Sequence, residues 1–579
     1  MKKLFKAILV FHLLLNSQAE GQMKTPVQLP STVIIPASDF LYDLPKGNTI
    51  TDAGNLKVDW LFNNTGLVLK SESNMMTQVQ MPEAGKYFLF VRSHGAKETS
   101  FKIAVNDKVT DSVFGNESLR WKQGGSFDVK AGLTNVKITR IDPGSVFDVL
   151  VLTRNPELKD EDIIPYQLNA DVKLLKEYKI PASGCVKFGD VTGDGLTDFM
   201  VLTPGYSSHI FDHSGKELWS WMAPDVYTKE RSEFEAPGLI WDFDKDGKGE
   251  VVQWRMIEDQ EWLVIADGQS GVIKRKIEWP AKALPHVYNN FRLAIAKLTN
   301  GDPNEISVFT DMGGTIRVDA YNSSLQHLWN HTENRKKDNL GHYIYPVDLN
   351  KDGIDEILVG SLLLDANGKK IWDRFALLND NHDHADSYKF ADIDSDGNMD
   401  IVTANSETGI FIYKGMTGEI VWQNVAEHTQ QIQAGNFLIG VGGLQVVAGA
   451  RTYGNRQINE PYLSSQLYWF NNEGKMLFKW PGTPLNGNPD FVKGDWWGTG
   501  KPQLFWYKFR INDKGTGDLY FPDGVFHMFD FSGRGAEEVI TLSRGMLRVY
   551  GSTKVKYSNR DRKKDLRYLQ LSVVNHTHY

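Results

Sequence analysis

Four nine-residue loops rich in aspartate are the clearest chemical feature of the sequence. They span residues 190–198, 242–250, 348–356 and 392–400, and each has glycine at its sixth position. Oxygen-bearing side chains stand at the first, third, fifth and ninth positions, where a sharply turned loop can direct them toward one centre. The predicted metal ligands are Asp190, Thr192, Asp194, Asp198, Asp242, Asp244, Asp246, Glu250, Asp348, Asn350, Asp352, Glu356, Asp392, Asp394, Asp396 and Asp400.

The cofactor that this ligand set predicts is Ca2+. Calcium takes six or more oxygen ligands, and the seventh position of each loop can add a backbone carbonyl. Without a cation the carboxylates of one loop would repel one another. The alternative is a solvated acidic turn that holds no ion. We expect the ions to be structural, because the lone Cys185 cannot close an internal disulfide.

The loops belong to a repeat that fills residues 171–555. Degenerate copies start at positions 297, 436, 495 and 530, so eight copies follow one another at intervals of about 35–59 residues. Strand-like segments follow the loops, and such intervals are typical of four-stranded propeller blades. The expected fold class is all-β, with an eight-bladed β-propeller preceded by a β-sandwich. The degenerate copies are expected to bind no ion, because carboxylates are replaced there by Lys297, Asn436 and Gln503.

The regions outside the repeat have distinct compositions. Residues 1–19 have a basic start, an apolar run and a small-residue cleavage site, which predicts a signal peptide and a secreted or periplasmic protein. Short alternating strands predict a carbohydrate-binding-like β-sandwich over residues 20–155, with a spacer without ligand as the alternative. Residues 156–170 are the expected linker. The basic tail, residues 556–579, is expected to pack on the propeller.

The overall composition limits the possible partners. The chain has 64 Lys and Arg against 72 Asp and Glu, and this net charge of −8 gives no general attraction to nucleic acid. No apolar run is long enough to insert into a membrane. We expect a monomer.

A ring of polar residues stands five to eight positions ahead of the loops. In a propeller these positions begin the inner strands, so their side chains would converge at one mouth of the central channel. The alternative is that they only cap strand ends. The ring comprises Glu235, Asn290, Arg292, His342, His384, Asp386, His428, Gln430, Asn488 and Asp490.

Several of these segments resemble the rhamnogalacturonan lyases of polysaccharide lyase family 11. The similar segments are Gly341-His342 and His384-Ala-Asp386 ahead of their loops, Thr417 to Trp422, Gly533 to Val539, and Leu547 to Tyr550. The resemblance implies an eight-bladed calcium-binding propeller, related to integrin-type FG-GAP repeats, that cleaves an acidic plant-type polysaccharide by β-elimination. It also implies that His342, His384, Asp386 and Glu407 match cleft or metal positions.

The sequence also departs from the family pattern. Lys389 stands where the family has a second histidine, Gly533-Arg-Gly replaces a tryptophan-containing segment, and the N-terminal sandwich replaces the usual beginning. These differences leave open a related lyase that acts on another glycan bearing rhamnose and uronate.

Eliminating a uronate glycoside requires a group that neutralises the substrate carboxylate and a base that is neutral near pH 7. Arg292 and Arg451 are the candidates for the first role. The candidates for base and acid are His342, His384, His428, Tyr388 and Lys389. Sugar rings could stack on aromatic side chains, although packing between blades is the alternative for each of Trp254, Trp262, Tyr288, Trp496 and Trp497. The competing functions are a non-catalytic propeller that binds glycan or protein and a propeller glycoside hydrolase.

Overall fold

The chain, seen in a computed structural model, is all-β apart from short helical turns, which confirms the predicted class. The expected signal peptide and basic tail lie outside the described residues. The structure describes residues 32–37, 39–40, 48–51, 53–58, 60–62, 65–70, 75–163, 172–182, 185–224, 236–281, 291–312, 314–334, 341–378, 383–424, 428–452, 464–480, 491–506, 509–511, 517–521, 523–543 and 545–555.

Eight four-stranded antiparallel sheets follow one another from residue 172 to residue 552. Seven of them are built from consecutive strands. The first four of these sheets contain β12 (Cys185–Gly189), β13 (Asp198–Thr203), β14 (Ser207–Phe211) and β15 (Glu217–Trp221); β16 (Gly238–Trp241), β17 (Glu250–Ile257), β18 (Gln260–Ala266) and β19 (Ile273–Glu278); β20 (Phe291–Ala296), β21 (Glu305–Asp311), β22 (Thr315–Tyr321) and β23 (His327–Asn334); and β24 (Ile344–Val347), β25 (Glu356–Val359), β26 (Leu362–Leu364) and β27 (Lys370–Asp373).

The remaining sheets continue this order. They contain β28 (Ala385–Ala391), β29 (Asp400–Asn405), β30 (Gly409–Lys414) and β31 (Ile420–Asn424); β32 (His428–Gly435), β33 (Gln445–Thr452), β34 (Ser464–Phe470) and β35 (Met476–Trp480); β36 (Phe491–Gly494), β37 (Gln503–Trp506), β38 (Phe509–Ile511) and β39 (Gly517–Tyr520); and, in the eighth sheet, β11 (Val172–Lys179), β42 (Met546–Ser552), β41 (Glu538–Ser543) and β40 (Gly524–Phe529).

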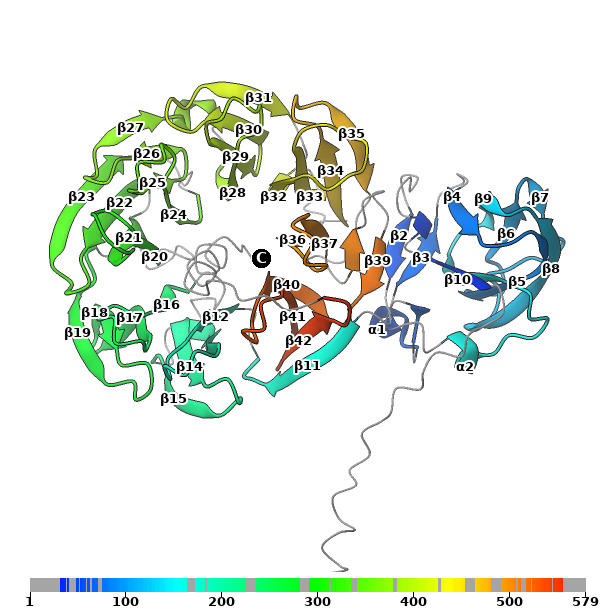
Figure 1. The fold of residues 1–579 in the computed structure, drawn as a ribbon, viewed down its shortest axis with the longest axis horizontal. Helices are drawn as coiled ribbons and strands as arrows, with labels where there is room; N and C mark the ends of the chain where they lie inside the picture. The colour runs from blue at the N-terminus through cyan, green and yellow to red at the C-terminus, as the bar shows by residue number, and fades with distance from the viewer. Residues whose placement is uncertain are drawn as a thin grey trace, which may run out of the picture.

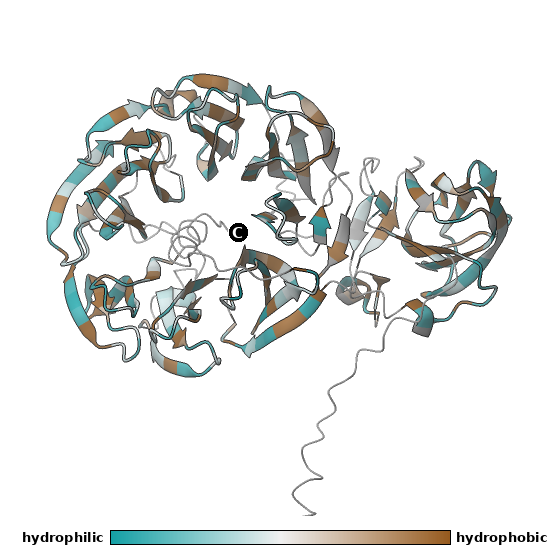
Figure 2. Cartoon of the chain, viewed as in Figure 1, coloured by the Kyte–Doolittle hydropathy of each residue, from teal (hydrophilic) through white to brown (hydrophobic). Residues whose placement is uncertain are grey.

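Figure 1 shows the eight sheets arranged around a ring, with β12, β16, β20, β24, β28, β32, β36 and β40 nearest its centre. The second strand of a sheet is packed on both faces, so β13 and β29 are fully buried along their lengths. Outermost strands face solvent on one side, and exposure alternates along β23. Figure 2 shows the corresponding hydrophilic bands between hydrophobic ones on the outer strands. This burial pattern gives each strand one place in its sheet.

The eighth sheet joins the two ends of the ring, because β11 pairs with β42 although the two are far apart in sequence. The side chain of Tyr178 in β11 packs where the two ends of the ring meet. Its hydroxyl donates to the carbonyl of His213 at 2.9 Å, and its ring lies 5.1 Å from Phe199 and 6.1 Å from Phe531. The Tyr178 side chain therefore contacts residues of both the first and the last of the eight sheets in the ring.

The N-terminal region forms two further sheets around a shared apolar core. One consists of β2 (Thr49–Thr51), β3 (Gly66–Leu69), β10 (Ser145–Thr153), β5 (Gly85–His94) and β8 (Arg120–Val129), with β1 (Thr32–Pro36) paired to β10. The other consists of β4 (Met75–Met81), β9 (Gly132–Asp142), β6 (Ser100–Val105) and β7 (Lys108–Val109). The short helices are α1 (Ala53–Leu56) and α2 (Asp160–Ile163).

Residues 156–163, the described part of the expected linker, pack on the N-terminal sheets. Leu158 and Ile163 are buried beside Phe90 and Val151, and the Trp121 indole donates to Asp160 at 2.8 Å. Side chains of the ring, including Trp469 and Trp506, share the hydrophobic cluster of the N-terminal core. Among the described residues, no helix has the length and apolarity that crossing a membrane would require.

Replacing Tyr178 by alanine tests the joint. We expect Tyr178→Ala to lower the free energy of unfolding by about 3–5 kcal/mol, because a large buried ring is lost between two sheets. Tyr178→Phe loses one hydrogen bond and should cost only about 1 kcal/mol. Denaturant unfolding monitored by tryptophan fluorescence measures both. Equal stabilities for the alanine variant and the natural chain would contradict this role.

Candidate functional site

The four acidic loops share one hydrogen-bonded turn, which lies between the inner strand of a sheet and its second strand. The first-position aspartate accepts a hydrogen bond from the amide of the sixth-position glycine. The distances are 2.8 Å for Asp190, 3.0 Å for Asp242, 3.0 Å for Asp348 and 2.9 Å for Asp392. The ninth-position carboxylate accepts from the second-position amide at 2.8–2.9 Å in every loop. Two side chains therefore fix each turn.

Backbone conformation explains the sixth-position glycine. Gly247, Gly353 and Gly397 have φ between 89° and 90°, a left-handed conformation that other residues adopt only at a cost. The two clamping bonds leave other carboxylate oxygens facing the centre of the turn. Ligand atoms of Asp242, Asp244 and Asp246 lie within 4.8 Å of one another, as do those of Asp392, Asp394 and Asp400.

The electrostatics of the loops fit a hard cation. Burial raises the pKa of the ninth-position carboxyl group in all four loops, which places partly desolvated negative charge at each centre. The Oδ1 atoms of Asp242, Asp348 and Asp400 are buried and have no hydrogen-bond partner among the described residues. A cation bound at these oxygens would supply the missing charge. Calcium binding stays a prediction.

The degenerate loops keep the same turn with other residues. Glu305 and Gln445 accept from main-chain amides as the ninth-position acids do, at 2.9 Å from Leu298 and 2.7 Å from Phe437. Asp495 and Asp530 still accept from sixth-position glycines, at 2.6 Å and 2.7 Å. The degenerate loops thus keep the hydrogen-bonded turn although they lack the full set of oxygen ligands for a cation.

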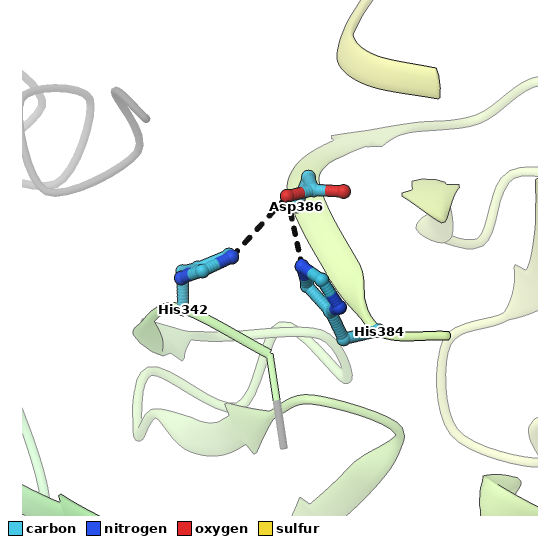
Figure 3. Close-up of side chains that lie close together, drawn as sticks. All are labelled: His342, His384 and Asp386. Atoms are coloured by element: carbon cyan, nitrogen blue, oxygen red, sulfur yellow. Dashed lines mark ion pairs between the residues drawn. The ribbon is translucent and has the colours of Figure 1, made fainter. Parts of the chain in front are cut away.

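A second cluster lies at the opposite ends of the inner strands, where His342, His384 and Asp386 meet (Figure 3). The Nε2 atoms of both histidines lie 3.3 Å from Asp386 Oδ1, and the two rings are 4.6 Å apart in an edge-to-face arrangement. His342 precedes β24, whereas His384 and Asp386 lie at the start of β28. The histidine side chains are 16% and 21% exposed and the carboxylate is fully buried.

The charge of Asp386 is set by the two imidazoles. Burial alone would raise the pKa of this carboxyl group, but the nearby His384 and His342 outweigh it and hold the pKa below its usual value. The cluster therefore presents an ionised carboxylate between two nitrogen donors. This donor set suits a metal such as zinc or manganese better than calcium, which prefers oxygen.

The turn between β29 and β30 supports this cluster. Ser406 Oγ lies 3.1 Å from His384 Nδ1, and the amide of Ser406 donates to the carbonyl of His384 at 3.0 Å. The buried carboxylate of Asp383 accepts from the amide of Glu407 at 2.8 Å. Neither Ser406 nor Asp383 was predicted, although both lie within a few residues of positions in the polar ring or its family match.

His428 extends the cluster to the next sheet. It begins β32, its Nδ1 lies 3.7 Å from Glu407 Oε1, and its Nε2 lies 3.0 Å from Gln430 Nε2. The buried Arg451 stands opposite His428 in the β32–β33 ladder. On the other side, Arg292 of β20 lies 5.6 Å from the Tyr343 ring, next to His342. These residues therefore lie on, or directly ahead of, strands of four consecutive sheets, those that begin with β20, β24, β28 and β32.

Two of the predicted bases have other surroundings. Tyr388 is buried in the apolar core, its hydroxyl donates to the carbonyl of Gly360, and burial raises its pKa well above the usual value. The structure thus gives Tyr388 a packing position and not a place at the opening, because its ring points between two sheets. Lys389 makes no hydrogen bond or ion pair with the described residues. Burial, assisted by the neighbouring Lys493, lowers its pKa to about 7.

Several other predicted residues can be placed. Trp254 and Trp496 are fully buried, so they pack between sheets rather than stack on a ligand. Trp262 and Trp497 are partly exposed and carry cations over their rings, Lys276 at 3.8 Å and Arg510 at 4.9 Å. The residues that fall outside the described part of the chain are Glu235, Tyr288, Asn290, Asn488 and Asp490.

No family model and no curated protein matches the sequence. Solved structures do match. The family 11 rhamnogalacturonan lyase of Bacillus licheniformis is 15% identical, with a TM-score of 0.51 over 85% of this chain and 92% of its own. The rhamnogalacturonan lyase YesW is 15% identical, with a TM-score of 0.52 over 88% of this chain and 93% of its own.

The chain resembles the rhamnogalacturonan lyase fold. Both similarities extend over most of each chain, so the likeness concerns the arrangement of the ring as a whole. At 15% identity it describes the fold and leaves the chemistry to the residues of the site.

Metal binding at the histidine cluster can be measured directly. We expect His384→Ala to weaken Zn2+ or Mn2+ binding by at least about tenfold, because one of three ligands is removed. His327→Ala is the matched control, since His327 Nε2 lies 3.1 Å from Asp319 on an outer strand. Equilibrium dialysis with metal analysis compares the two variants. Unchanged binding in His384→Ala would contradict the assignment.

Proposed function

We propose that the protein is an exported polysaccharide lyase that cleaves an acidic glycan containing rhamnose and uronate. In this proposal the eight four-stranded sheets are the blades of a monomeric, calcium-binding β-propeller of the FG-GAP type. The observation that carries the proposal is the pair His342 and His384 held on the buried Asp386. The cluster stands at the starts of inner strands, in a fold similar to that of known rhamnogalacturonan lyases.

The reaction is a β-elimination without net oxidation or reduction. A base removes the proton from the uronate carbon beside the carboxylate, and the carbon–oxygen bond to the departing sugar breaks. The electron pair of the C–H bond forms a carbon–carbon double bond, while that of the broken bond stays on the leaving oxygen, which takes up a proton. The site must therefore stabilise negative charge on the carboxylate and exchange a proton on each side.

The residues present match these requirements. Arg292 and Arg451, on the first and last sheets of the cluster, provide permanent positive charge for the carboxylate. His342, His384 and His428 provide imidazole nitrogen atoms that can accept or donate a proton. Asp386 orients two of these imidazoles and is a positioning residue. A divalent cation held by His342, His384 and Asp386 would withdraw charge from a bound carboxylate, and proton transfer would then fall to His428, because a metal-bound imidazole nitrogen cannot accept a proton.

Lys389 is the remaining candidate base. Its lowered pKa favours a neutral amine near pH 7. However, it lies three residues beyond Asp386 on β28, which corresponds to about 10 Å along the strand. We therefore assign the proton transfer to the imidazoles.

Activity of an Asp386 variant tests the proposal. We expect Asp386→Asn to lower kcat/KM by about 10²–10⁴-fold on rhamnogalacturonan, because both imidazoles lose the carboxylate that positions them. Lys389→Met is the control on the same strand and should retain activity within about threefold. Ultraviolet absorbance of the unsaturated uronate product measures the rate.

The product distinguishes the competing functions. A glycoside hydrolase would generate reducing ends without the unsaturated product. A non-catalytic propeller would bind the glycan and release neither. If Asp386→Asn keeps full activity while Lys389→Met loses it, the base is the lysine and the histidine assignment is wrong.

A further inference from the structure

Two of the four acidic loops already contain a positively charged group. Lys274 of β19 places Nζ 2.5 Å from Glu250 Oε1, 3.0 Å from Asp244 Oδ2 and 4.0 Å from Asp267 Oδ2. Lys274 reaches this loop from the fourth strand of the same sheet. The 242–250 loop thus has a lysine among its third- and ninth-position carboxylates.

The 392–400 loop has the same arrangement with a different lysine. Lys414, the last residue of β30, places Nζ 2.5 Å from Asp394 Oδ2 and 3.8 Å from Asp400 Oδ1, and it also contacts the Asp396 carboxylate. These are the third, fifth and ninth positions of the loop. Two lysines from different places in their sheets, a fourth strand and a third strand, reach equivalent positions.

The 348–356 loop differs. Among the described residues, no lysine, arginine or histidine forms an ion pair with Asp348, Asp352 or Glu356. Its third-position Asn350 donates its amide to both Asp352 and Glu356 at 3.0 Å. Among the side chains that the structure describes, none balances the negative charge of this loop through an ion pair.

We propose that the ammonium groups of Lys274 and Lys414 are the resident cations of their loops, so that the 242–250 and 392–400 loops hold their turns without calcium, whereas the 348–356 loop requires it. A primary ammonium carries a single charge and three donors, which suits two or three carboxylates that converge at hydrogen-bond distance. The inference rests on the proposed calcium binding of the acidic loops. It divides three of the four loops, which look equivalent in sequence, into two classes.

Removing a lysine should convert its loop into a calcium site. In chelator, we expect the full mature chain carrying Lys414→Met to melt roughly 2–5 °C below the natural chain, because three carboxylates lose their counter-charge. Calcium should restore the difference, and equilibrium dialysis should find one additional bound calcium per chain. Lys274→Met should behave in the same way, and Lys414→Gln repeats the test with a polar side chain.

Two controls make the result specific. Lys369→Met removes a lysine from an exposed turn without an ion pair among the described residues, so it should change neither melting temperature nor calcium count. Asp352→Asn in the otherwise natural chain should reduce the calcium count by one.

The outcomes separate the two proposals. An unchanged calcium count in Lys414→Met and Lys274→Met, together with a loss in Asp352→Asn, would overturn the lysine proposal while calcium binding stands. If no variant binds calcium, the proposed calcium role fails. The chelator melting curves still decide whether the lysines stabilise their loops, and equal curves for all variants would overturn that role as well.

Discussion

The structure depends on one repeated constraint, the clamp that two acidic side chains place on the turn between the inner strand and the second strand of a sheet. One oxygen of the first-position aspartate binds the sixth-position amide, and one oxygen of the ninth-position residue binds the second-position amide. These bonds fix the angle at which one strand turns back on the other. The clamp is also present where the cation ligands are lost, as Gln445 shows. Turn geometry and metal binding are thus separable properties of the same residues.

The clamp also determines on which side of the ring the candidate site lies. Because every inner strand ends at its loop, every inner strand begins on the opposite side of the ring. Residues near these beginnings come together although they are far apart in sequence, as His342 and His384 do across two sheets. The site is held by strands packed on both faces, so its imidazoles have little freedom to move apart.

Sequence patterns predicted much of this arrangement, with failures that have physical causes. The spacing of the loops predicted the repeated sheets, and the alignment on their first position placed His342, His384 and Asp386 in one register. Tyr388 stands two residues beyond Asp386 but points between sheets, because the β-bulge at Asp386 interrupts the alternation of side chains along β28. Aligning the repeats on their first loop position predicts where along a strand a residue lies, but it does not predict which way its side chain points. In the expected linker, Leu158 and Ile163 are buried in the N-terminal region, a contact that no local pattern indicates.

By itself, the sequence determined the all-β class, the number of repeats and the acidic turn chemistry, because these depend on residue types at short, regular intervals. Only the tertiary structure decided which carboxylates have a counter-charge. Lys274 and Lys414 approach their loops from strands whose positions depend on sheet packing, and no interval in the sequence indicates that they reach the same place. The contacts of His384 with Ser406 and of His428 with Glu407 likewise depend on which strands lie side by side in the folded chain. Local patterns fix turns, whereas charge balance is set by the packing of distant segments.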